Sequence, residues 1–195
     1  MKRNKRQERF LALLEPRLED LSRFCLAMTH EVEGGRDLMS DVILAAWERF
    51  DSLRDEEAFL SFLFTIARRT YHRRHRRERF FGEYDEQAAL NIAVNGTPVW
   101  IGADVRALYD ALAKLPEVQR EAIVLFELTG LSLKEVAEVQ KASLSAVKSR
   151  VSRGRERLAE LLGIEPEVKS GQVSLGRNIV TNTDISPSHN TLFST

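Results

Sequence analysis

Apolar residues recur at steps of three and four along most of the first 81 positions, which is the spacing of amphipathic helices. Pro16 divides the stripe between positions 10 and 28 into two helices, because a proline ring suits a first turn and clashes further inside. Gly34 and Gly35 predict a break before a helix that opens at Asp37 and reaches Phe50. A third, longer helix follows from Phe59. We therefore expect a compact helical domain over residues 1–81.

A second helical unit is predicted after a stretch with no periodicity. Residues 82–104 collect Gly, Asn, Thr and Pro and predict a flexible linker. Between 105 and 126 two apolar stripes are separated by Pro116, and Gly130 is placed to end the second helix. After Leu162 the composition turns to Ser, Thr, Asn and Gly, so we expect residues 163–195 to form a poorly ordered polar tail.

The second unit contains the outline of a helix-turn-helix. Ser132 and Glu135 have the spacing of a capping box and predict the start of a short helix. A turn near residues 140–143 leads into a longer helix over 145–162. A short helix, a tight turn and a longer basic helix favour a DNA-binding helix-turn-helix, and a generic hairpin of two helices is the alternative. The expected domain is residues 105–162.

Composition excludes several classes of protein. Cys25 is the only cysteine, which rules out an internal disulfide framework and a CxxC metal site. The longest apolar-rich stretch, residues 58–67, is too short to cross a bilayer. We expect a soluble, cytoplasmic protein without membrane insertion, and we expect neither a metal nor any other cofactor.

The formal net charge is zero, from 29 basic and 29 acidic residues, yet the charges are unevenly distributed. Residues 68–79 hold seven arginines and two histidines against one glutamate, and residues 141–157 hold six basic residues against one glutamate. Acidic residues concentrate instead between Glu31 and Glu57. Basic blocks of this kind favour polyanionic partners, and two solvated helix faces are the alternative.

The helix over 145–162 has the properties of a DNA-reading helix. If its valines and leucines point inward, Lys148, Ser149, Ser152 and Arg153 lie near its exposed N-terminal half. The major groove admits one α-helix, and Arg or Lys can donate two hydrogen bonds to guanine. Arginines further along this helix would meet phosphates, which position a protein without reading sequence. These arginines are Arg150, Arg155 and Arg157.

The other basic block also carries an aromatic residue. Arginine combined with aromatic faces is how proteins hold unstacked bases, and Tyr71 is the candidate for an exposed ring. His72 and His75 are three residues apart, but two ligands do not make a metal site. Asp37 and Asp41 lie one helical turn apart with no catalytic partner in the sequence, so a solvated or protein-binding face is the better interpretation. We therefore expect no enzymatic activity.

Two stretches resemble a known family, the extracytoplasmic-function (group IV) sigma factors of bacterial RNA polymerase. The sequence from Asp37 to Glu78, DLMSDVILAAWERF and onward, resembles their region 2. The sequence from Leu115 to Leu158, LPEVQREAIVLFELTGLSLKEVAEVQ and onward, resembles their region 4. The resemblance covers about residues 8–162 and implies an all-α fold of two small domains, a region 2 bundle and a region 4 helix-turn-helix, joined by a flexible linker.

The resemblance implies three partners: core RNA polymerase, promoter DNA and an anti-sigma factor. The clamp helices of the polymerase largest subunit would contact Asp37, Asp41, Leu44, Trp47 and Glu48. The promoter −10 element would contact Arg68, Arg69, Tyr71, His72, Arg73 and Arg76. The −35 element would contact Ser145, Lys148, Ser149, Arg150, Ser152, Arg153 and Arg155.

This sequence departs from the family pattern at four positions. Phe62 stands where tryptophan is common, Arg69 where asparagine is common, Lys141 where a turn glycine is usual, and Ala146 where threonine is common. Two alternative functions remain open: a sigma mimic that sequesters an anti-sigma factor, and a one-component regulator that uses only its helix-turn-helix. A nucleic-acid-processing enzyme is the least favoured alternative, because no catalytic constellation is present.

Overall fold

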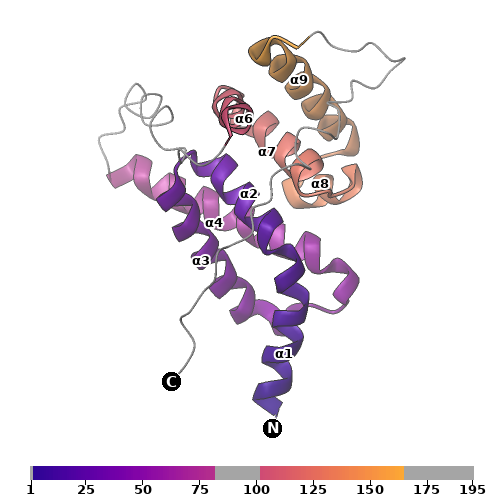
Figure 1. The fold of residues 1–195 in the computed structure, drawn as a ribbon. Coiled ribbons are helices and arrows are strands. Elements are labelled where there is room, and N and C mark those ends of the chain that lie inside the picture. The colour runs from indigo at the N-terminus through magenta and orange to yellow at the C-terminus, as the bar shows by residue number, and fades with distance from the viewer. Residues whose placement is uncertain (1, 82–101, 165–195) are drawn as a thin grey trace.

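The structure, a computed structural model, describes residues 2–81 and 102–164. Within these two ranges the chain is helical, and no strand is formed. Figure 1 shows helices α1 to α4 as one group and α6 to α9 as a second group stacked on one end of it. The predicted linker and tail lie outside the described residues, apart from 102–104 and 163–164. The described residues thus form two helical units, as the sequence predicted.

The first unit consists of α1 (Lys2–Leu14), α2 (Leu18–Thr29), α3 (Val32–Arg49) and α4 (Phe59–Phe81). Pro16 lies in a short 3-10 turn, η1 (Glu15–Arg17), so the predicted interruption is present. Two further 3-10 turns, η2 (Phe50–Ser52) and η3 (Glu56–Ala58), connect α3 to α4. The side chain of Asp55 caps the second of these by accepting a hydrogen bond from the Glu57 amide, 2.9 Å.

The break predicted at Gly34 and Gly35 is wrong in position. α2 ends at Thr29, its C-cap His30 has a left-handed φ of 60°, and α3 has already begun at Val32. Both glycines lie in the first turn of α3, where Gly35 is buried against the backbone of Leu26. The absence of a side chain at Gly35 therefore serves close packing of α3 on α2, and does not end a helix.

The second unit consists of α6 (Ala103–Ala113), α7 (Glu117–Ile123), α8 (Leu133–Gln140) and α9 (Leu144–Leu162). α7 continues into a π-helical turn, η4 (Val124–Leu128), and Gly130 follows with a φ of 72°. Helix α6 begins two residues before the predicted start at Val105. The predicted starts of the two helices of the helix-turn-helix lie within one residue of the observed starts of α8 and α9, whereas α7 ends as an α-helix at Ile123, well before Gly130.

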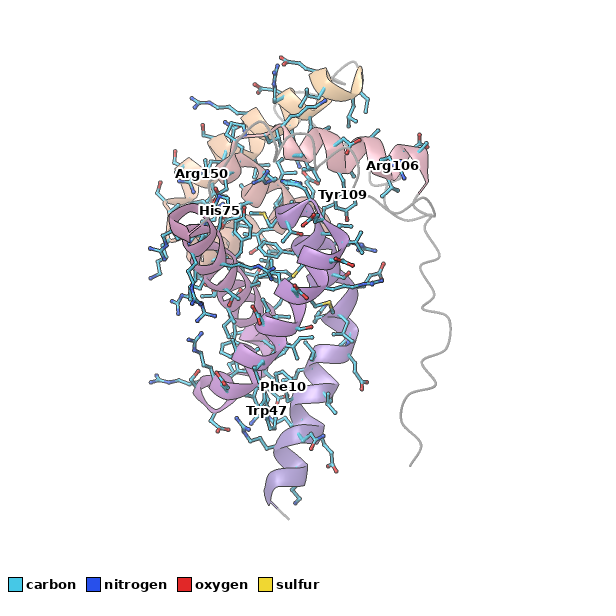
Figure 2. The ribbon with its side chains drawn as sticks, turned by 90° about the vertical axis from the view of Figure 1, so that its left-hand side faces the viewer. Phe10, Trp47, His75, Arg106, Tyr109 and Arg150 are labelled. Carbon is cyan, nitrogen blue, oxygen red and sulfur yellow. The ribbon has the colours of Figure 1, made fainter. Side chains whose placement is uncertain are left out.

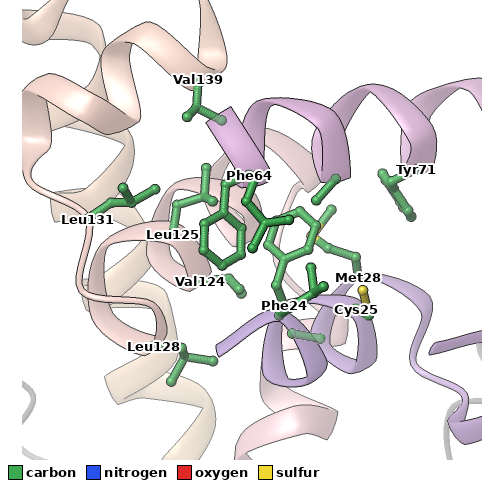
Figure 3. Packing of buried hydrophobic residues seen from close by; sticks show 14 of the residues in the cluster. Phe24, Cys25, Met28, Phe64, Tyr71, Val124, Leu125, Leu128, Leu131 and Val139 are labelled. Carbon is green, nitrogen blue, oxygen red and sulfur yellow. The ribbon is translucent and has the colours of Figure 1, made fainter. Parts of the chain in front are cut away.

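The two units share one continuous hydrophobic core. Figure 3 shows Phe24 of α2 and Phe64 of α4 facing Leu125 of η4, with Val139 of α8 above them. All four side chains are buried. Cys25 lies in the same core, and burial raises the pKa of its thiol to about 12. The sequence predicted two domains separated by a linker but did not predict that they pack on one another.

Candidate nucleic-acid interface

The helix-turn-helix is built by local capping at both of its helices. Ser132 and Glu135 form the predicted capping box at the start of α8, with the Ser132 amide donating to Glu135 Oε2 at 2.7 Å. Ser143 caps α9 by accepting a hydrogen bond from the Ala146 amide, 3.2 Å. Between the helices, Lys141 adopts a φ of 50°, the left-handed conformation that glycine adopts without strain. The turn therefore keeps its left-handed residue although a lysine occupies the position.

One face of α9 is exposed and polar. Val147, Val151 and Leu158 point into the core, as predicted. The exposed polar residues then fall at steps of three and four along the N-terminal half of the helix, which places them on a single face. These residues are Ser145, Lys148, Ser149, Ser152 and Arg153.

The two remaining arginines of the predicted −35 set are half-buried and hold the motif together. Arg150 donates to the side chain of Gln140, 2.7 Å, and Gln140 in turn donates to the carbonyl of Val118, 3.2 Å. Arg155 donates through Nε to Glu127, 2.6 Å. Both arginines thus tie α9 to α7, η4 and α8. The sequence did not indicate the role of Gln140, which is buried at the end of α8.

Helix α4 separates the predicted −10 residues into three sets. Arg69, Arg73 and Arg76 are exposed and recur at steps of four and three, which places them on one face. Tyr71 is only 6% exposed, and its ring stacks on the His75 ring with the two ring centroids 5.7 Å apart. The expectation of an exposed aromatic ring is therefore wrong. Tyr71 belongs to the cluster of buried residues that forms the core, at the edge of the group drawn in Figure 3.

The third set faces the second unit. Arg68 pairs with Glu121 of α7, whose side chain is 1% exposed. The two ring nitrogens of His72 lie 3.0 Å from Glu117 and 3.3 Å from Glu121. Sequence patterns did not single out either glutamate. Their spacing of four residues places both on one side of α7, but this spacing alone does not indicate a basic partner from another unit.

The predicted polymerase-binding residues lie on α3, where most are exposed. Asp37, Asp41, Leu44 and Glu48 recur at steps of three and four, and Leu44 is 59% exposed. Asp37 also lies 3.4 Å from the guanidinium of Arg74 on α4. This face is acidic around an exposed leucine, which is a suitable composition for a protein partner.

Trp47 differs from the other residues of this set because α1 covers it. The guanidinium of Arg6 lies 3.8 Å from the Trp47 ring centroid, and Phe10 meets the same ring edge to face at 5.3 Å. Figure 2 shows Phe10 and Trp47 together at the α1 end of the molecule. Trp47 therefore fastens α1 to α3, and the exposed part of the acidic face lies on the residues around it.

Two family descriptions match the two helical units of this chain. Sigma-70 region 2 matches residues 13–81, and Sigma-70, region 4 matches residues 105–158. The ECF RNA polymerase sigma factor EcfG of Rhodopseudomonas palustris is 30% identical over 148 residues, which cover 74% of this chain and 80% of EcfG.

Two solved structures have the same fold. One is the sigma factor RpoE in complex with the anti-sigma factor NepR from Bartonella quintana, with a TM-score of 0.68 and 28% identity over 81% of this chain and 99% of that chain. The other is CnrH in complex with the cytosolic domain of CnrY, with a TM-score of 0.58 and 25% identity over 80% and 89% of the two chains. The two matched regions together with these relatives show that this chain belongs to the extracytoplasmic-function group of the sigma-70 family of RNA polymerase sigma factors.

Proposed function

We propose that this protein binds core RNA polymerase and directs it to promoters through separate contacts with their −10 and −35 elements. One observation carries the proposal: a single chain presents an acidic face on α3, a basic face on α4 and a polar, basic face on the second helix of a helix-turn-helix. The family supplies the identity of the partners, and the exposure of these faces indicates which side chains are available to each.

The acidic α3 face is the proposed contact with the clamp helices of the polymerase largest subunit. Leu44 supplies apolar area, and Asp37, Asp41 and Glu48 surround it with negative charge. Charges at the rim of an interface steer association and select partners, so the acidic residues favour a basic counterpart. Trp47 contributes by holding α1 against α3.

The α4 face is the proposed −10 contact. Arg69, Arg73 and Arg76 are available on the exposed face, and Arg68 and His72 become available once they leave α7. Arginine guanidinium groups pair with phosphate and stack on bases, which suits a strand held apart from its complement. The buried Tyr71 supports the helix from inside.

The α9 face is the proposed −35 contact. Lys148 and Arg153 can donate to guanine in the major groove, and the exposed serines can donate to or accept from several bases. Arg150 and Arg155 fix the position of the helix from behind. In this arrangement α9 enters the groove with its N-terminal half, and the first helix of the motif, α8, lies across the backbone.

The remaining parts of the proposal concern regulation, location and chemistry. The structures of RpoE with NepR and of CnrH with CnrY are complexes of a sigma factor with another protein, and an anti-sigma factor is a proposed partner here. Among the described helices, none combines the length and the apolar character that a membrane span requires. We place the protein in the cytoplasm, with the polymerase, and assign it no catalytic activity of its own.

Transcription in vitro tests the proposal. Core polymerase with this protein should initiate on a subset of a promoter library, and core polymerase alone should not. A one-component regulator would bind DNA without enabling initiation. A sigma mimic would bind an anti-sigma factor, also without enabling initiation.

A further inference from the structure

The turn of the helix-turn-helix contains a lysine in a conformation that lysine rarely adopts. Lys141 is the C-cap residue of α8, with a φ of 50° and a ψ of 48°. Its amide donates to the carbonyl of Glu138, 3.2 Å, and the amide of Ala142 donates to the carbonyl of Ala137, 2.9 Å. Paired bonds of this kind close a helix around a left-handed residue, which is usually glycine because a Cβ is unfavourable there.

The side chain of Lys141 has no role inside the described part of the chain. Among the described residues, His30 is the other non-glycine residue with a positive φ, and its imidazole accepts a hydrogen bond from Arg120. The Lys141 side chain is exposed, and it forms no hydrogen bond or ion pair with any described residue. Strained backbone positions cluster at ligand-binding sites. This contrast favours a role for Lys141 in binding a partner outside the chain.

The position of Lys141 in the motif indicates which partner this is. Lys141 lies two residues before Ser143, the N-cap of α9, and two residues span at most about 7 Å. In a helix-turn-helix the second helix enters the major groove by its N-terminal residues, and the first helix crosses the DNA backbone. Lys141 joins these two elements. It therefore lies where the wall of the groove, a row of phosphates, passes beside the start of α9.

The chemistry of the side chain suits a phosphate. Lysine is a compact cation on a flexible stem and binds phosphate as a point charge. The exposed α9 face carries the cations Lys148 and Arg153, and Lys141 adds another in the turn that precedes them. Glu138 lies one turn earlier on α8 but forms no ion pair with Lys141. No carboxylate in the described ranges therefore competes with DNA for this ammonium group.

We propose that Lys141 is a further DNA-binding residue, whose ammonium group binds a backbone phosphate at the edge of the groove that α9 enters. This role rests on the proposed −35 function of α9. The family resemblance does not imply the contact, because glycine is usual at this position. The favourable contact with phosphate in the complex offsets the unfavourable backbone conformation of the free chain.

One substitution should then move stability and DNA affinity in opposite directions. Lys141→Gly relieves the strained backbone and removes the charge, so it should raise Tm and weaken DNA binding. Lys141→Ala removes the charge and keeps the strain, and Lys141→Arg keeps both. A purely structural role would change stability and affinity in the same direction, because a less stable turn holds α9 less firmly against DNA.

The test is the affinity of the full chain for a fluorescent pool of duplex DNA of random sequence, measured over a range of salt concentrations. Loss of one phosphate contact makes the slope of log affinity against log salt shallower by about 0.9. The loss of affinity relative to the parent should therefore be about 3.5 times larger at low salt than at a fourfold higher salt concentration. We expect Lys141→Gly and Lys141→Ala to show this change equally, and Lys141→Arg to match the parent.

Lys114→Ala is the matched control. Lys114 is also an exposed C-cap lysine, at the end of α6, but its φ of −82° is unstrained and it lies outside the motif. The slope for Lys114→Ala should equal that of the parent. A parental slope in Lys141→Ala, or an equal change in Lys114→Ala, would overturn the proposal. A slope in Lys141→Arg as shallow as in Lys141→Ala would also overturn it, because the positive charge is kept.

Sequencing of the DNA that each variant selects from the pool separates a phosphate contact from a base contact. Lys141→Ala should select the same sequences as the parent, because phosphates carry no sequence information. A changed preference would contradict the phosphate assignment. If Lys148→Ala alters the salt slope and Lys141→Ala does not, α9 remains the DNA-binding helix and only the role of Lys141 is wrong. If neither variant alters it, the proposed −35 function of α9 is wrong as well.

Discussion

Arg120 of α7 donates a hydrogen bond to His30 Nε2 at the end of α2, 2.6 Å, and so joins the two units at a second buried polar contact. Arg120 is 8% exposed and also donates to the carbonyl of Ala113, 3.3 Å. The imidazole must stay neutral to accept from a guanidinium. Burial, followed by the charge of Arg120, lowers the pKa of His30 to about 3 from its ordinary 6.5.

This contact predicts that acid destabilises the folded chain. Unfolded chains bind a proton at His30 below pH 6.5, whereas the folded chain does not until about pH 3, so stability is present above 6.5 and is lost as the pH falls toward 3. In that window the slope from this group approaches about 1.4 kcal/mol per pH unit. Urea denaturation at a series of pH values measures this pH dependence of the free energy of unfolding.

The variant His30→Asn isolates that contribution. Asparagine tolerates the left-handed conformation that His30 adopts, and it does not titrate. The variant should be less stable at neutral pH but should lose the part of the acid slope that His30 supplies. An acid slope equal to that of the parent would show that other groups are responsible.

A methyl group at Gly154 should destabilise the second unit. A Cβ there would lie 2.7 Å from Cγ1 of Ile123, because α9 crosses α7 at this glycine. Overpacking of a core typically costs about 1–3 kcal/mol, and alanine regains about 1 kcal/mol over glycine inside a helix. We therefore expect Gly154→Ala to lower the free energy of unfolding by up to about 2 kcal/mol. Gly102→Ala is the matched control, since nothing lies within 4 Å of its added Cβ.

A double variant tests whether the added methyl group clashes with Ile123. In the double variant Gly154→Ala/Ile123→Ala the clash is removed, so its cost should be less than the sum of the two single variants. Simple additivity would mean that Gly154 acts through the backbone and not through contact with Ile123.

Replacing Lys141 with glycine should stabilise the helix-turn-helix. Its φ of 50° costs an ordinary residue about 1–2 kcal/mol, which glycine avoids. Some of that gain is offset because glycine is more flexible in the unfolded chain. Lys141→Gly should therefore raise Tm relative to Lys141→Ala, which removes the same charge and keeps the strain. Equal Tm values would show that the turn is not strained.

Loss of charge on the α9 face should weaken DNA binding by the full chain. If the basic residues near Lys148 and Arg153 contact about six phosphates, log affinity should fall with log salt with a slope of about −5. Lys148→Ala and Arg153→Ala should each lower affinity and make that slope shallower. Lys114→Ala removes an exposed charge from the end of α6 and serves as the control. Equal effects of the three substitutions on affinity would show that the α9 face is not the DNA-binding face.

The sequence predicted those features that depend on neighbouring residues. The capping box at Ser132 and Glu135, the interruption at Pro16 and the inward positions of Val147 and Val151 each follow from local hydrogen bonding or helical periodicity. The exposed polar positions of α9 follow from the same periodicity.

Features that depend on packing between distant segments could not be predicted in this way. Tyr71 lies on the helix face that the core covers, and Gly35 marks a close helix contact instead of a helix end. The burial of Glu121 and Arg120 is even harder to predict from the sequence. Charged residues are rarely buried without partners, and the partners of these two lie on α2 and α4. No periodicity in α7 indicates them.

Transcription from mapped start sites tests the central claim most directly. Core RNA polymerase would be combined with this protein, or with its Asp37→Lys/Asp41→Lys variant, on a promoter library, and every start would be sequenced. The account predicts starts that depend on the protein, lie downstream of one shared pair of −10 and −35 sequences, and disappear with the variant while its DNA affinity is kept. No protein-dependent start on any promoter would contradict the account.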